Sequence, residues 1–338
     1  MKHFITIQII LLTAFANGAM GQDPSFSQFF SSPLNINPSL TGNINSDWRV
    51  IANLRDQWAG AASPYVTGTI SYDAKLFTKA SHADDDNYVG IGAMLMYDDA
   101  MGGIVKSTYA SLNLSYNIKL AQFGETKHRL GLGFGGIYGR RYIDFSNVDF
   151  EEQFTGTGFN KNLPTGENAL SNMKPYMSVS SGLLYSYSSG SNNIDIGVAA
   201  FHLNQPNQTF LNDANQRLPM RKVAHANYET VLSSSLILVT NAIYQQQLEA
   251  EYFSVGGGLG YFLNNEGSSL INAGLWYWSK NAVVPYIGLV HNNIQYGLSY
   301  DVTISKISQA GRRPNTGELS VILRGKRKPS GFIPCPWN

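Results

Sequence analysis

The sequence predicts an all-β chain that forms a transmembrane, antiparallel, up-and-down β-barrel of about 14 strands. Residues 107–120 alternate between apolar and polar side chains without interruption, which is the period of a strand and not of a helix. This run exceeds the roughly 9 to 11 residues with which a tilted strand crosses a bilayer, so one face can meet lipid and the other water. The same alternation returns at residues 294–305, near the end of the chain.

The amino-acid composition is more typical of a barrel than of a soluble enzyme. Of 338 residues only 14% are charged, whereas the chain contains 33 Gly, 19 Tyr and 17 Phe. The 24 basic and 23 acidic residues give a formal net charge of +1, which gives no reason to expect nucleic acid as a partner. The single cysteine, Cys335, excludes a disulfide within the chain and disfavours a structural zinc site.

Residues 1–21 have the pattern of a signal peptide. Lys2 and His3 precede an apolar run over residues 4–12 that is too short to span a membrane, and small residues follow it before a predicted cleavage ahead of Gln22. No later stretch approaches 18 consecutive apolar residues, so an exported chain of this kind is periplasmic, secreted or a barrel. The length and two-faced pattern of the strands favour a multi-pass barrel in the outer membrane of a Gram-negative bacterium. Its outer face would contact the lipid bilayer.

Residues 22–45 are predicted to be irregular. Three prolines interrupt any strand ladder, while the aromatic side chains of Phe26, Phe29 and Phe30 still require burial. One interpretation is a disordered periplasmic leader. The other is a plug or docking strip that lodges in the barrel mouth or is held by a partner, and the density of aromatic residues favours burial of some kind.

The barrel is predicted to span residues 46–324. Each strand is identified by alternating polarity between turn signals. The strands are centred on residues 47–57, 66–76, 88–97, 107–120, 128–138, 176–187, 194–201, 223–231, 236–245, 251–262, 270–278, 283–290, 294–305 and 317–324.

The first two strands predict an ion pair in the lumen. Their charged faces belong inside, because a Lys or Arg on the lipid face near the midplane costs about 2–4 kcal/mol. If the turn between them closes a regular hairpin, Arg49 lies opposite Asp73. The alternative is two independently solvated charges.

Loop lengths predict the orientation of the barrel. With both ends in the periplasm, alternate connections face outward, and these are the longer ones in an outer-membrane barrel. The longest gaps, residues 144–175, 203–220 and 306–316, all fall on the outward side, whereas most inward turns are short. Residues 77–87 are the exception, and residues 325–338 are expected to form a periplasmic tail.

No catalytic, cofactor or metal motif is expected. The glycine-rich stretches at residues 131–136 and 256–260 lie within strand-like alternation, so we interpret them as bends or as places where a neighbour fills the lumen, and not as dinucleotide loops. The histidines have no metal-ligand spacing. A catalytic Ser/His pair formed across strands stays open as an alternative, but no motif in the sequence points to one. We predict that the chain is not an enzyme.

Several short motifs resemble those of one protein family. They are residues 23–30 with Asn37-Pro38 and Gly42, then Arg55-Asp-Gln57-Trp58, Ser299-Tyr300-Asp301 and Gly317-Glu318-Leu319-Ser320. These motifs resemble the start, the first strand and the closing hairpin of PorP/SprF family proteins, which are outer-membrane components of the type IX secretion system. The resemblance covers the mature chain from end to end.

The resemblance implies a non-enzymatic role without a cofactor. It implies a membrane platform that engages the C-terminal sorting domain of a dedicated secreted protein, often an adhesin. It also implies contact with periplasmic or lipoprotein components of the secretion machinery. The alternative function is that of an outer-membrane porin or solute transporter, which shares the fold and differs in having an open lumen.

The predicted contact surfaces follow from this orientation. Outward loops are the usual place for recognition, so the loops at residues 144–174 and 203–220 are candidates for cargo binding. The N-terminal strip and the basic tail are candidates for docking to the periplasmic machinery, although a tail that contacts lipid or peptidoglycan is equally compatible. The cargo-binding candidates are Phe159, Leu163, Phe210 and Arg217, and the docking candidates are Phe26, Phe29, Phe30, Lys326, Arg327 and Lys328.

Overall fold

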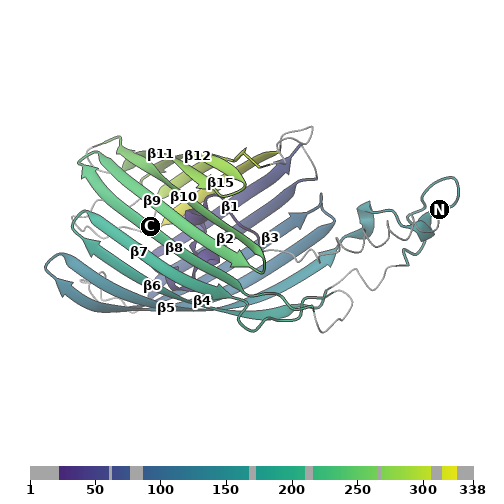
Figure 1. Cartoon of the computed structure of the whole chain (residues 1–338), viewed down its shortest axis with the longest axis horizontal. Coiled ribbons are helices and arrows are strands. Elements are labelled where there is room, and N and C mark those ends of the chain that lie inside the picture. The colour runs from purple at the N-terminus through teal and green to yellow at the C-terminus, as the bar shows by residue number, and fades with distance from the viewer. Residues whose placement is uncertain are drawn as a thin grey trace, which may run out of the picture.

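The computed structural model describes residues 23–60, 63–76, 87–166, 173–209, 216–264, 268–305 and 314–325. These residues form one closed antiparallel sheet, which confirms the predicted barrel (Figure 1). The strands are β1 Trp48–Ala59, β2 Tyr65–Leu76, β3 Tyr88–Ala100, β4 Val105–Phe123, β5 Thr126–Ile143, β6 Tyr176–Ser189, β7 Asn192–Phe201, β8 Arg221–Ser233, β9 Leu236–Gln247, β10 Ala250–Phe262, β11 Ser269–Trp278, β12 Ala282–His291, β13 Ile294–Tyr300, β14 Val302–Thr303 and β15 Asn315–Arg324. The predicted signal peptide lies outside the described residues.

The fifteen strand segments make fourteen barrel strands. Segments β13 and β14 both pair with β12 in one continuous register, so they are two halves of the same strand. The ladder is interrupted beside Pro285 of β12, which has no N–H to donate. The barrel closes where β1 pairs with β15, its last strand, as well as with β2.

The barrel is apolar outside and polar inside, as strand β4 shows. Leu112 and Leu114 are 71% and 57% exposed on the outer face, whereas Ser111 and Asn113 are buried on the inner face. A soluble protein would bury the leucines instead. The exposed apolar surface is explained by contact with lipid, in agreement with the alternation in the sequence.

The two ends of the barrel differ in their connections. The connection between β5 and β6 carries the 3₁₀ helices η3 Phe145–Asn147 and η4 Glu151–Gln153, and Figure 1 shows it extending away from the barrel. The connection between β7 and β8 leaves the same end. At the opposite end β4 and β5, β6 and β7, and β12 and β13 are joined by two-residue turns. We call the end with the long connections the outer end and the other the inner end.

Residues 23–47 occupy the lumen, and we call this segment the plug. It contains only short helices, η1 Phe29–Ser31, α2 Pro33–Ile36 and η2 Pro38–Leu40, which lie inside the barrel in Figure 1. Most of its residues are buried. No helix in the described part of the chain has the length and apolar character needed to cross a membrane. Asp23 contacts His202 and Gln247 at the outer ends of β7 and β9, whereas the Asp47 carbonyl accepts a hydrogen bond from the Lys75 N–H near the inner end of β2. The plug therefore runs through the lumen from the outer end to the inner end.

Glycines in the wall make room for the plug. A Cβ atom on Gly133 of β5 would lie 2.1 Å from the backbone nitrogen of Ser39, and one on Gly90 of β3 would lie 2.1 Å from the Thr41 carbonyl oxygen. The glycine-rich stretches at residues 131–136 and 256–260 lie within β5 and β10 and are not phosphate-binding loops. At Gly133 the expected neighbour that fills the lumen is the plug.

Substituting Gly133 tests this fit. Gly133→Ala should lower the free energy of unfolding by about 1–3 kcal/mol, because the added methyl group collides with plug backbone that cannot rotate away. Gly136→Ala is the matched control, since no atom lies within 4 Å of its Cβ position. Urea unfolding in detergent micelles gives both values, and equal losses for the two variants would contradict the seating described above.

Candidate functional site

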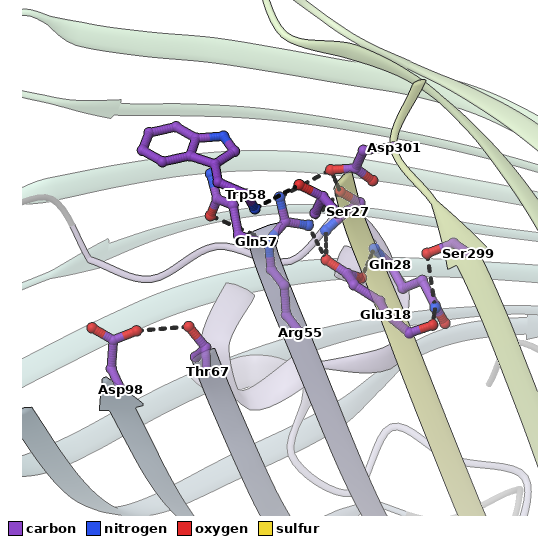
Figure 2. A network of polar contacts seen from close by, with 11 residues as sticks. Ser27, Gln28, Arg55, Gln57, Trp58, Thr67, Asp98, Ser299, Asp301 and Glu318 are labelled. Carbon is purple, nitrogen blue, oxygen red and sulfur yellow. Dashed lines mark hydrogen bonds and ion pairs between the residues drawn. The ribbon is translucent and has the colours of Figure 1, made fainter. Parts of the chain in front are cut away.

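Four stretches that lie far apart in the sequence meet in the outer half of the lumen (Figure 2). Ser27 and Gln28 come from the plug, Arg55 from β1, Asp301 from the break between β13 and β14, and Glu318 from β15. They belong to the motifs that carry the family resemblance. We call this cluster the central latch.

The strand register places the latch residues. Alternation along β1 turns Arg55 inward, and the pairing of β1 with β15 sets Arg55 directly opposite Glu318. Asp301 occupies the position where β13 ends, and its N–H donates to the Thr316 carbonyl at 2.9 Å. The neighbouring strands therefore hold three charged side chains on the same patch of the luminal wall.

Arg55 is the centre of the latch. Its guanidinium donates to Asp301 Oδ2 at 2.9 Å, to Glu318 Oε1 and to Ser27 Oγ at 2.6 Å. It also lies over the ring of Trp278, 5.1 Å from the centroid. The side chains of Arg55, Asp301 and Glu318 are almost fully buried, so bulk water contributes little to the stability of these charges.

The plug supplies the remaining partners of Glu318. The carboxylate accepts hydrogen bonds from the backbone N–H groups of Ser27 at 2.6 Å and Gln28 at 2.8 Å. The Gln28 side chain donates to Ser299 Oγ and accepts from Ser320 Oγ. One guanidinium faces two carboxylates here, so the N–H groups of the plug help to compensate the excess negative charge. The latch is complete only with the plug in place.

A second contact holds the plug near the inner end. Arg49 and Asp73 form the ion pair that the hairpin register predicts, with Arg49 Nε 3.0 Å from Asp73 Oδ1. The second carboxylate oxygen of Asp73 accepts from Arg49 Nη2 at 3.0 Å and from the Gly42 N–H at 2.8 Å. The pair thus binds the plug as well as joining two strands, a role that the hairpin pattern alone does not indicate.

A third contact holds the plug at the outer end. The Asp23 carboxylate lies 3.1 Å from Arg221 Nε and 2.8 Å from His202 Nε2, and the other ring nitrogen of His202 contacts the Ser178 hydroxyl at 2.7 Å. Burial opposes ionisation of Asp23, but Arg221 and His202 outweigh it and hold the pKa of this carboxyl well below its usual range. Ser178 is buried, so its hydroxyl is not open to a substrate and serves to orient His202.

The aromatic residues of the plug lie in the lumen and not on the periplasmic surface. Phe30 packs against Trp276 and Tyr286, with ring centroids 4.9 and 5.5 Å away. Phe26 and Phe29 are also buried. The wall covers all three rings, so the prediction that they dock to a periplasmic partner is corrected: they anchor a plug. The sequence indicated the need for burial but not which surface provides it.

The predicted cargo-binding residues lie in two loops at the outer end. Phe159 and Leu163 are exposed in the β5–β6 loop, where Phe159 pairs with Phe154 at a ring distance of 5.2 Å. Arg217 is exposed in the β7–β8 loop, where it forms a bridge with Asn207. Phe210, Lys326, Arg327 and Lys328 lie outside the described residues. Over the described ranges, no group of three His, Cys, Asp or Glu side chains is arranged to hold a metal ion.

Comparisons with known proteins agree on the fold. A family model described as type IX secretion system membrane protein PorP/SprF matches residues 19–323. Among solved structures, the CymD monoaromatic hydrocarbon channel is similar with a TM-score of 0.51 at 8% identity, over 91% of this chain and 96% of that one. The toluene transporter TbuX of Ralstonia pickettii is similar with a TM-score of 0.46 at 12% identity, over 91% and 97%. No curated protein sequence matches the chain. At 8% identity the likeness to CymD shows the fold alone.

Removing the central cation tests the latch. Arg55→Met should lower the free energy of unfolding by about 3–5 kcal/mol, because two buried carboxylates lose their counter-charge. Lys222→Met, at an exposed position of β8, should change it by less than about 0.5 kcal/mol. Urea unfolding in detergent measures both, and adding Asp301→Asn to Arg55→Met should recover part of the loss. A loss no larger than that of the control would contradict the latch.

The outer contact predicts a dependence on pH. Because the folded-state pKa of Asp23 is depressed, its stabilising contribution is fully present above the unfolded value of about 3.9 and is lost as pH falls through the folded value. The unfolding free energies of the native chain and Asp23→Asn should therefore differ by about 1.5–3 kcal/mol at pH 5. The difference should shrink only below about pH 4. A difference that is already gone at pH 5 would contradict this assignment.

Proposed function

This chain belongs to the PorP/SprF family of type IX secretion system membrane proteins, and we propose that it is a surface platform that engages a specific secreted protein through its C-terminal sorting domain. It is an outer-membrane barrel, and its family is one of secretion components. In the proposed role, its outer loops bind the secreted protein while its inner end contacts periplasmic or lipoprotein components of the machinery.

The filled lumen is the observation that carries the proposal. The plug is buried along most of its length and is bound at the outer, central and inner contacts described above. A lumen occupied in this way does not favour free diffusion of solutes. The surfaces that stay available for a function are then the outer loops and the inner end.

The β5–β6 loop is the proposed contact for the secreted protein. It projects beyond the strand ends and carries its own small fold, in which the Phe154–Thr155 turn returns to Phe159 through a bridge. Aromatic residues, phenylalanine included, are enriched in the cores of protein interfaces relative to the rest of the surface. Arg217, and Phe210 by its position in the sequence, would extend this surface on the neighbouring loop.

The inner end is the proposed contact for the secretion machinery. The two-residue turns at this end would face the periplasm in the proposed orientation. The basic residues Lys326, Arg327 and Lys328 follow the last strand and would add charge complementarity toward an acidic partner. Phe26, Phe29 and Phe30 are not part of this surface.

The alternative function, a porin or solute transporter, requires a different state of the lumen. It requires a continuous aqueous path through the lumen, which the plug would have to vacate. A steady open conductance of the full chain in planar bilayers, at neutral pH and moderate salt, would favour the transporter over the platform.

Removing the loop aromatics tests the platform. Phe154→Ser with Phe159→Ser should reduce co-purification of the secreted protein from mild detergent by about tenfold or more, because hot-spot residues contribute at least about 2 kcal/mol to an interface. Phe134→Ser is the control, since Phe134 is 63% exposed midway along β5, away from both ends of the barrel. Unchanged co-purification with a folded loop variant would count against the proposed function.

A further inference from the structure

We propose that the lumen is a polypeptide-binding site, filled in this structure by the plug, which a segment of a second protein can occupy by displacing the plug from the outer end. The partner is a segment that carries a carboxylate followed by an aromatic residue. That the segment belongs to the secreted protein rests on the proposed function. The binding site itself rests on the contacts between wall and plug.

The wall binds the backbone of the plug as well as its side chains. Side chains of the wall hydrogen-bond to seven polar backbone atoms of the plug, at distances of 2.6 to 3.0 Å. These atoms are the nitrogens of Asp23, Ser27, Gln28 and Gly42 and the carbonyl oxygens of Ser31, Asn35 and Thr41, bound by Gln247, Glu318, Asp73, Asn53, Arg221 and Ser115. Every polypeptide carries such groups, so these contacts do not require the sequence of the plug.

Glycines on three different strands of the wall leave space for the plug. A Cβ atom added to Gly90 or Gly133 would lie 2.1 Å from a backbone atom of Thr41 or Ser39. A Cβ atom added to Gly182 would lie 2.0 Å from the side-chain oxygen of Asn37. Glycine weakens a strand relative to other residues. These glycines therefore lower the stability of the strands, and the plug occupies the space that they leave.

Side-chain pockets define what the occupant should contain. Phe30 lies between Trp276 and Tyr286, which forms a pocket for an aromatic ring. Near the outer end, Arg221 and His202 bind the Asp23 carboxylate. An acidic side chain some seven residues before an aromatic one therefore satisfies both places, and that spacing is the one found in the plug.

The plug does not fill its seat completely. A small cavity remains between Leu34 of the plug and the Met94, Met96 and Tyr109 side chains of the wall. Methionine side chains are flexible and polarisable, so this part of the wall can adapt to different residues. An occupant with larger apolar side chains here gains contacts that the plug does not make.

Displacement must begin at the outer end. Within the described residues, the plug is continuous with the wall only through Trp48 at the inner end, whereas its outer end is held by the side-chain and backbone contacts of Asp23. The Asp23 side chain is 14% exposed, so a competing carboxylate can reach Arg221 first and the central latch next. This end also carries the long loops at which a secreted protein is proposed to dock.

A peptide-exchange experiment on the full chain tests the binding site. The probe is a fluorescent synthetic peptide with the sequence of residues 23–45, and its binding is followed by polarisation in detergent. The tethered plug acts at an effective concentration of order mM, so the native chain should bind little of it. Phe30→Ala with Asn37→Ala weakens only the plug and leaves the wall intact, and this variant should bind about tenfold more peptide.

The controls decide the outcome. Adding Glu318→Gln to the plug-weakened chain should reduce peptide binding about tenfold, because the wall then keeps an acceptor oxygen for only one of the two backbone N–H groups and presents an NH2 donor to the other. Folding of each variant is judged by heat-modifiable mobility on gels. If the chain with Phe30→Ala and Asn37→Ala does not fold, Asp23→Asn is used in its place to weaken the plug. A folded plug-weakened chain that binds no more peptide than the native chain, or that binds a shuffled peptide equally, overturns the inference.

The two proposals fail in different ways. Normal peptide exchange with loss of the secreted protein from every co-purification counts against the proposed function alone. Normal co-purification without any exchange counts against the luminal binding site alone.

Discussion

The constraint on which the rest of the structure depends is the burial of three charges, Arg55, Asp301 and Glu318, away from bulk water. Buried charges are tolerated only when each is paired and hydrogen-bonded. The first strand, the last strand and the plug each supply part of that pairing, so closing the barrel and filling it satisfy the same electrostatic need. Other features of the lumen, such as the glycines facing the plug, fit a chain that is held at this point.

The strands could be predicted from the sequence because one local rule governs them. Alternation along β4 places Leu112 toward lipid and Asn113 toward the lumen whatever the rest of the chain does. The pairing of Arg49 with Asp73 was within reach for the same reason, since a single hairpin sets its register. The break at Asp301 was not predicted, because its cause lies across the ladder at Pro285.

The central latch could not be predicted because its parts are distant in sequence. Arg55 and Glu318 are separated by 263 positions and meet only through barrel closure. The motifs can be identified in the sequence, but a motif does not show which other residues its side chains contact. The aromatic residues of the plug illustrate the same limit: hydrophobicity required that Phe30 be covered, and only the fold identified Trp276 and Tyr286 as the covering surface.

The pairing of β1 with β15 makes the contacts of the plug depend on closure of the barrel. During biogenesis the residues that emerge first, Ser27 and Gln28, cannot find their acceptor until the residues made last bring Glu318 into place. A truncated or misregistered chain would therefore keep an unpaired guanidinium at an open edge. Completion of the buried ion pairs therefore requires the C-terminal hairpin, and an intermediate without the hairpin would lack both carboxylates that face Arg55.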